Sequence, residues 1–284
     1  STDNPQIIYQ EVKIPIKKIN LYTKIIAILK SKNEINRAII ALENFKVKDI
    51  QKLATRVRPS NFKNYLLNNL DKGEVEKILI DIKLGDNFQI NDYHVNGSVK
   101  KINVKATNDL FLKDVSLNFV SDKNLTLINS LNAKYQGTLI SDGSLSLKRN
   151  KQIDIEGKFN SKFKLKDDGV KKLFNKSNIK FLEKNKINMQ GSLLHDFSLK
   201  INENFTLIDY EYNSNGRISE SKVVFENNFK SDFFENPIKK ISISDANLSI
   251  NLNKKKDNLL MLEGLYNLGG AENKKFKVSY DLNK

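Results

Sequence analysis

From residue 74 onward, apolar and polar residues alternate along the chain. Ile78, Ile80 and Ile82 share one phase, and the same period of two recurs as far as Val278 and Tyr280. Because successive side chains of a β-strand point to opposite faces, each run predicts a strand with one apolar face. Turn-forming residues separate the runs at intervals of about 8–12 residues, which is typical of an antiparallel meander.

Breaks in this alternation predict bulges and turns. The phase shifts by one near residues 100–101 and again over 112–115, so we expect a bulge or tight turn at each place. From Leu125 to Leu139, by contrast, the apolar residues keep one phase. The sequence also predicts turns at 122–124, 142–143 and 215–216, and one helical interruption near 168–176.

The first 73 residues follow a different pattern. The predicted elements are a strand at 12–16, a helix at 21–29 that Asn20 caps, a strand at 35–47, and helices at 49–57 and 60–70. We therefore expect an N-terminal strand–helix unit over residues 1–73 and an antiparallel β meander over 74–284. The chain begins in polar sequence and ends within the strand pattern, so we also expect a piece of a longer protein.

Four glycines recur inside predicted strands, each with strand-type residues on both sides. They are Gly97, Gly157, Gly191 and Gly264. Glycine weakens a strand and often marks a bend or bulge, so four at comparable positions favour curvature in a long sheet. The alternative is that they relieve crowding in the core of a sandwich.

An antiparallel sheet with one apolar face must cover that face. It can pack on a second sheet, close into a barrel, or curl into a groove whose apolar cargo supplies the missing layer. We expect mainly β structure with a few short helices and a long curved antiparallel sheet, as an open groove or half-barrel; a closed core is the alternative. The candidate groove residues are apolar positions near the middle of the sheet: Leu125, Leu127, Leu131, Tyr135, Leu139, Ile153, Ile155, Phe159 and Phe163.

The charge of the chain points to a solvated outer face. Its 48 basic and 33 acidic residues give a net charge of +15. The basic residues are spread along the whole chain, mostly at outward strand positions, and the densest runs, at 254–256 and 274–275, fall where turns are expected. A nucleic-acid site would gather them on one element, so nucleic-acid binding ranks third among the functions considered. Weak attraction to anionic lipid surfaces is a secondary expectation.

Residues suited to catalysis or metal binding are scarce. The chain has no cysteine, which excludes disulfides, thiolate zinc sites and cysteine nucleophiles. His94 and His195 are the only histidines, and a lone histidine in a strand is more often a surface residue or a hydrogen-bonded core residue than a ligand. The carboxylates at 167–168 stand where helix capping is expected. We therefore expect a non-catalytic protein without metal or cofactor.

Several segments resemble the AsmA-like superfamily of bacterial envelope proteins, which includes the TamB and YhdP kinds. The strand at 12–16, the helix at 21–29 and the strand at 35–47 are similar to the start of an AsmA-like domain. The stretch YHVNGSV at 93–99, followed by LFLKDVSLNF at 110–119, is similar to a recurrent strand phrase of the superfamily. Similar phrasing returns at 241–250.

This resemblance implies a periplasmic protein that is anchored in the inner membrane and contributes to outer-membrane biogenesis. It implies a curved sheet whose apolar groove holds phospholipid acyl chains, with no catalytic residues, and other envelope proteins as possible partners. The anchoring transmembrane helix of the superfamily has no counterpart here, because no apolar run approaches about 18 residues. A structural β-sandwich interaction module of the envelope is the alternative function.

Overall fold

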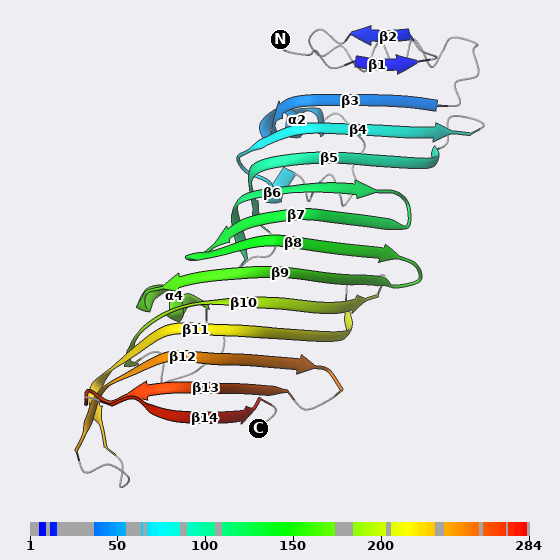
Figure 1. Ribbon diagram of the computed structural model, residues 1–284. Helices are drawn as coiled ribbons and strands as arrows, with labels where there is room; N and C mark the ends of the chain where they lie inside the picture. The colour runs from blue at the N-terminus through cyan, green and yellow to red at the C-terminus, as the bar shows by residue number, and fades with distance from the viewer. Residues whose placement is uncertain are drawn as a thin grey trace. The chain divides into compact units, whose positions relative to one another are not determined.

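The computed structural model describes residues 6–9, 12–15, 37–54, 64, 67–85, 90–105, 110–173, 184–202, 206–230, 236–255, 258–270 and 272–282. The described strands form one antiparallel sheet in the order β14-β13-β12-β11-β10-β9-β8-β7-β6-β5-β4-β3-β1-β2 (Figure 1). This sheet is open and is not closed into a barrel. The prediction of a mainly β protein with an open antiparallel sheet and a few short helices is therefore confirmed.

The chain divides into two compact units, which we describe separately. Unit 1 comprises residues 1–133 and 144–150, and unit 2 comprises residues 134–143 and 151–284, so the division falls within β7 and β8. Elements of the first part of the chain are β1 (Gln6–Tyr9), β2 (Val12–Pro15), β3 (Arg37–Lys46), α2 (Val47–Ala54), β4 (Glu74–Leu84), β5 (Ile90–Lys105), β6 (Phe111–Ser121), β7 (Leu125–Tyr135) and β8 (Thr138–Arg149). They are followed by β9 (Ile153–Leu165), α4 (Asp167–Leu173), β10 (Lys186–Ile201), β11 (Leu207–Phe229), β12 (Ile238–Asn253), β13 (Leu259–Asn267) and β14 (Lys274–Asp281).

In unit 1, β2 lies within the strand predicted at 12–16. The strand predicted at 35–47 corresponds to β3, and the helix predicted at 49–57 corresponds to α2, which begins two residues earlier and ends three residues earlier. Of the helix predicted at 60–70, residues 64 and 67–69 are helical. The helix predicted at 21–29 lies outside the described residues. Strand β3 pairs with β4, so the N-terminal elements continue directly into the meander.

Bulges in β5 and β6 account for the phase shifts seen in the sequence. The pairing of these strands shifts register between Val99 and Ile102, where Lys101 has a φ of 52°, and Asp114 in β6 has a φ of 51°. A bulge adds one residue to a strand, so the apolar residues on either side stay on one face although their phase changes. Both predicted breaks are thus confirmed as bulges. The backbone N–H of Lys101 donates to Ser116 Oγ at 3.1 Å.

Three segments that the sequence predicts as turns are parts of strands. Residues 142–143 lie inside β8, and the turn that precedes this strand is at 136–137. Residues 215–216 lie inside β11, where Gly216 is opposite both Leu193 and Leu248. Residues 274–275 begin β14. An Asp-Gly or Asn-Gly pair forms a hairpin turn only when the flanking strands are able to pair with each other, and here neighbouring strands pair through these residues. The turn predicted at 122–124 is confirmed, because Asp122 Oδ1 accepts the N–H groups of Asn124 and Leu125, each at 2.8 Å.

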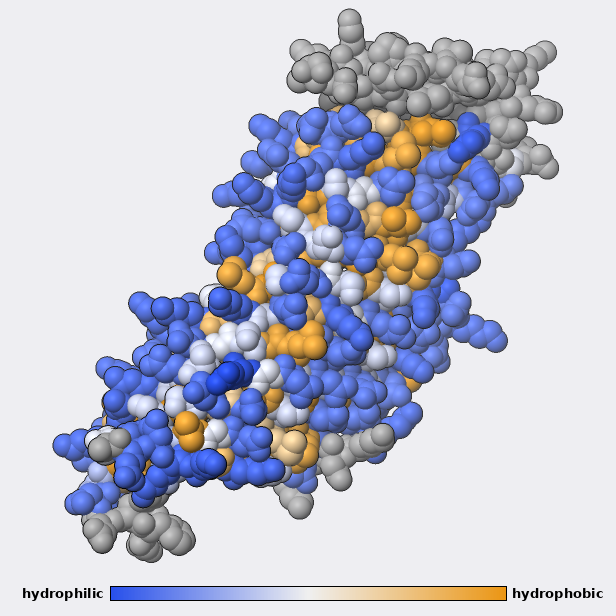
Figure 2. All heavy atoms as spheres, in the orientation of Figure 1, coloured by the Kyte–Doolittle hydropathy of each residue, from blue (hydrophilic) through white to orange (hydrophobic). Residues whose placement is uncertain are grey.

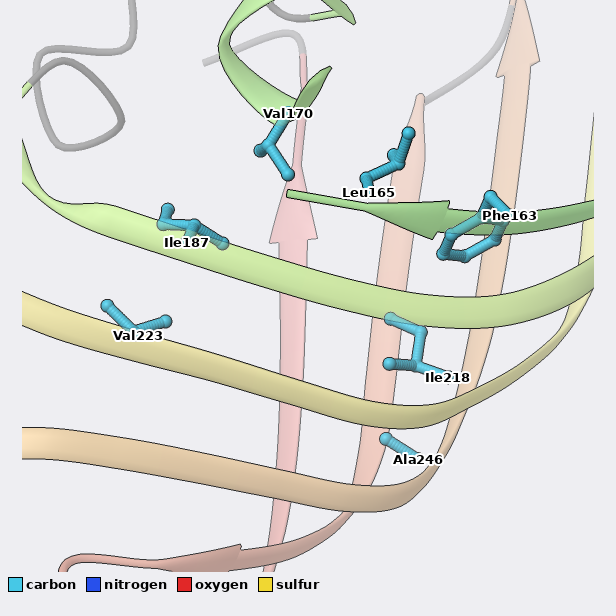
Figure 3. Close-up of a cluster of buried hydrophobic side chains, with 7 residues drawn as sticks. All are labelled: Phe163, Leu165, Val170, Ile187, Ile218, Val223 and Ala246. Carbon is cyan, nitrogen blue, oxygen red and sulfur yellow. The ribbon is translucent and has the colours of Figure 1, made fainter. Parts of the chain in front are cut away.

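Unit 2 has a small buried core beside α4, the helix predicted near 168–176. Val170 of this helix is 1% exposed, and six strand residues are buried with it. Figure 3 shows the ribbons of the strands curving around these side chains. The cluster consists of Phe163, Leu165, Val170, Ile187, Ile218, Val223 and Ala246. The short helix therefore covers one part of the apolar face of unit 2.

Each of the four predicted in-strand glycines faces a phenylalanine on a neighbouring strand. In unit 2 the cross-strand pairs are Gly157–Phe197, Gly191–Phe163 and Gly264–Phe276, and in unit 1 the pair is Gly97–Phe119. Gly97, Gly191 and Gly264 also have a neighbouring strand on the side away from the phenylalanine. The pairing with that strand shifts register close to the glycine. At Gly97 and Gly191 the phenylalanine ring lies close to where a Cβ atom would be, so it fills the space over the missing side chain beside the irregular pairing.

Candidate functional site

The inner face of unit 2, which we define as the sheet face that carries the buried core, is continuous from β9 to β14. The strand registers align its side chains in rows across the sheet. One row places Phe197 opposite Tyr212, which is opposite Leu252. A second row runs from Leu248 through Leu262 to Val278, so apolar residues of different strands meet along the face.

Part of the inner face lies away from α4 and its core. There Ile155, Phe197, Leu199 and Ile250 are half-buried, and Val278 on β14 is 49% exposed. All described strands belong to a single sheet, so the described residues contain no second sheet that packs on this face. The two-sheet arrangement that a sandwich requires is therefore not found in this part of the chain. The hydropathy colouring of Figure 2 shows apolar side chains gathered in patches bordered by hydrophilic ones.

Four of the nine candidate residues lie on the inner face of unit 2. Ile153, Ile155 and Phe159 are opposite Ile201, Leu199 and His195 of β10. Phe163 is also on this face, opposite Gly191, but it belongs to the buried core beside α4. The alternation of β9 therefore gave the correct face for these four residues.

The apolar residues from Leu125 to Leu139 keep one phase in the sequence, but the prediction that they therefore share one face of the sheet is wrong. Ser130 and Asp142 each have a φ of 54°, as Lys101 and Asp114 do at the bulges of β5 and β6. Leu127 and Leu139 are 38% and 50% exposed, whereas their neighbours at 128 and 140 are half-buried. Of the other candidates in β7, Leu125, Leu131 and Tyr135 are half-buried, the last two on either side of the buried Ala133.

A polar cluster interrupts the apolar inner face of unit 2. His195 is 7% exposed, and its ring stacks on Phe159 with the centroids 4.3 Å apart. Its Nε2 is 2.7 Å from Ser161 Oγ, and its Nδ1 is 2.7 Å from Tyr212 Oη. Both ring nitrogens are therefore hydrogen-bonded to hydroxyl groups, which hold the imidazole in one orientation.

Burial sets the protonation state of this cluster. It lowers the pKa of His195 and raises the pKa of Tyr212, so both side chains are neutral near pH 7. Ser161 is 5% exposed, so both members of the Ser161–His195 pair are buried. This geometry agrees with the reading of His195 as a hydrogen-bonded core residue. No sequence pattern pointed to Ser161 and Tyr212, because only the strand register brings them to His195.

Exposed charged residues pair across neighbouring strands in each unit. Cross-strand ion pairs join Lys158 to Asp196 at 2.9 Å in unit 2 and Arg37 to Asp81 at 2.6 Å in unit 1. Further pairs of the same kind include Arg217–Asp245, Lys277–Glu263 and Lys100–Glu76. Solvent screens such exposed pairs, so their effect is on strand register and solubility more than on stability.

Among the described residues, no group of histidine, aspartate and glutamate side chains is arranged to hold a metal ion. No described helix has the length and apolar character needed to cross a membrane. No protein-family model matches the chain, and no match was found among curated proteins or among solved structures.

Proposed function

We propose that the protein is a non-catalytic lipid-binding or lipid-transport component of the cell envelope. The observation that carries this proposal is the inner face of unit 2, to which each of the six strands from β9 to β14 contributes apolar side chains, without a second sheet among the described residues. An acyl chain would supply the missing layer and gain about 0.8 kcal/mol for each methylene group buried.

Phospholipid as the ligand, a periplasmic location and an anchor in the inner membrane rest on the AsmA-like resemblance. The segments at 93–99 and 110–119 that carry this resemblance lie in β5 and β6, with Gly97 opposite Phe119 at a bend of the sheet. A role in outer-membrane biogenesis and contacts with other envelope proteins belong to the same proposal.

The chain has no tryptophan, so one introduced indole reports lipid contact without background. Phe197→Trp places the indole on the inner face, and Leu194→Trp, on the same strand, places it on the outer face, where Leu194 is 54% exposed. The two purified variants are incubated with phospholipid brominated in its acyl chains and separated from vesicles. We expect strong fluorescence quenching in Phe197→Trp and little in Leu194→Trp.

Two controls make this experiment decisive. Circular dichroism checks that both variants keep the β structure of the wild type, and mass spectrometry measures the phospholipid that copurifies with the wild type. Equal quenching at the two positions would show adsorption without an inner-face site. Absence of both quenching and copurified phospholipid would reject the proposed function.

A further inference from the structure

Strands β11 and β12 extend beyond β10 at one end of unit 2 (Figure 1). Strand β10 begins at Lys186, opposite Val224, whereas β11 continues to Phe229 and lies opposite Ile238 of β12 there. We call residues 184–186, 222–230 and 236–241 the lysine end of unit 2. The strand pairing brings these three segments together, so their side chains form one surface.

Two phenylalanines carry the apolar face to the lysine end. Phe225 packs against the buried core, and its ring stacks with that of Phe229 with the centroids 5.6 Å apart. Phe229 is 45% exposed, whereas Ile238 opposite it is 5% exposed. An aromatic ring therefore stands at the surface on a support of buried and half-buried residues, which holds it in place.

Exposed lysines surround this ring. Lys230 follows Phe229 in the chain, and Lys239 follows Ile238, the residue opposite Phe229. The exposed lysines of the lysine end are Lys184, Lys186, Lys222, Lys230, Lys239 and Lys240. No ion pair of these six lysines is found among the described residues, and the lysine end contains one carboxylate, Glu226.

The lysines at the opposite end of β12 have partners. Lys255 forms an ion pair with Asp209 at 3.0 Å, and Lys254 Nζ donates to the backbone carbonyl oxygen of Ile208. Between the two ends, Arg217 of β11 meets Asp245 of β12 at 2.8 Å. Within the described parts of β11 and β12, positive charge without an acidic partner therefore gathers at the lysine end.

We propose that the lysine end binds the surface of an anionic phospholipid membrane. Lysines attract anionic headgroups, and an exposed aromatic ring enters the boundary between headgroups and acyl chains, so the two together are typical of interfacial anchors. An acidic protein would pair with the lysines but would also need an apolar pocket for Phe229, whereas a membrane supplies both chemistries. This contact is separate from a lipid held on the inner face and does not require one.

A tryptophan introduced at the lysine end reports insertion, because the chain has none of its own. Phe229→Trp places the indole there, and Leu207→Trp places it at the opposite end of β11, where Leu207 is also 45% exposed. Each variant is mixed with vesicles of equal parts phosphatidylglycerol and phosphatidylcholine brominated in their acyl chains. We expect quenching and a blue shift in Phe229→Trp while the vesicles are present, and neither in Leu207→Trp.

Two double variants that remove the same charge separate the lysine end from the net charge of the chain. One combines Lys239→Gln with Lys240→Gln, and the other combines Lys113→Gln with Lys123→Gln, at exposed positions of unit 1. A lysine at an anionic surface contributes about fivefold in affinity, so the first variant should bind the vesicles about thirtyfold more weakly than the wild type. The second should bind much as the wild type does. Circular dichroism checks that all variants keep their β structure.

The inference is overturned if the two double variants bind alike, because net charge alone then accounts for the attraction. Equal quenching of the two tryptophans also overturns it, as does a wild type that binds soluble polyglutamate, a stand-in for an acidic protein, but not vesicles. If Phe229→Trp does not fold, the double variants, which keep the phenylalanine ring, decide the question. A failure of lipid binding at Phe197 leaves all these outcomes unchanged, so the two proposals are tested separately.

Discussion

At the scale of single residues, His195 is a buried titratable group of unit 2. Burial lowers its pKa, so the folded protein keeps the imidazole neutral at pH values where the unfolded chain, with an ordinary histidine pKa of about 6.5, binds a proton. The free energy of unfolding should therefore fall as pH decreases below about 6.5, by up to about 1.4 kcal/mol per pH unit, until the lowered pKa of the folded state is reached. Urea unfolding at a series of pH values measures this slope.

Variants of the two histidines isolate the effect. His195→Gln removes the titrating group and should flatten the slope, although its loss of ring packing lowers stability at every pH. His94→Gln, at an exposed position of the same chain, serves as the comparison variant. Carboxylates act at lower pH: two backbone N–H donors lower the pKa of Asp122, so its contribution is lost only below about pH 4. A wild-type stability that is constant between about pH 5 and pH 7 would contradict the prediction.

At the scale of elements, Gly191 of β10 allows close approach of the Phe163 ring on β9 and of the backbone of β11. A Cβ atom added at Gly191 would lie 2.9 Å from the ring of Phe163 and closer still to the carbonyl oxygen of Arg217. Gly191→Ala should therefore lower the free energy of unfolding by about 1–3 kcal/mol, because ring and backbone have to move apart. Chemical denaturation followed by circular dichroism measures this change.

Gly270→Ala is the matched control, since a Cβ atom there would meet nothing within 4 Å. Its expected effect on the free energy of unfolding is within about 0.5 kcal/mol, as for most exposed substitutions. Equal stability of the two alanine variants would mean that the close approach at Gly191 is relieved at no cost.

The same elements show how far alternation in a sequence predicts a face. Bulges of β5 and β6 were visible because apolar residues flank them in two different phases. In β7 and β8 the exposed Leu127 and Leu139 continue the apolar phase past Ser130 and Asp142, where the backbone φ is positive, so the sequence shows no break. Ser130 and Asp142 are not glycines, so the sequence carries no glycine that would mark a positive φ at these two positions. The strands and their apolar faces were thus predictable, but the register that assembles Ser161, His195 and Tyr212 was not.

At the scale of the whole molecule, charge and apolar area make separable predictions about membranes. The net charge of +15 should draw the protein to anionic vesicles, and this attraction weakens as the Debye length falls from about 8 Å at 0.15 M salt to about 3 Å at 1 M. Burial of acyl chains on the inner face does not weaken with salt in this way. We therefore expect 1 M salt to abolish cosedimentation with anionic vesicles, while brominated lipid already bound to Phe197→Trp continues to quench. Vesicles of neutral lipid serve as the control for charge. If quenching and cosedimentation disappear together, the lipid was held by the basic outer face and not by the apolar rows.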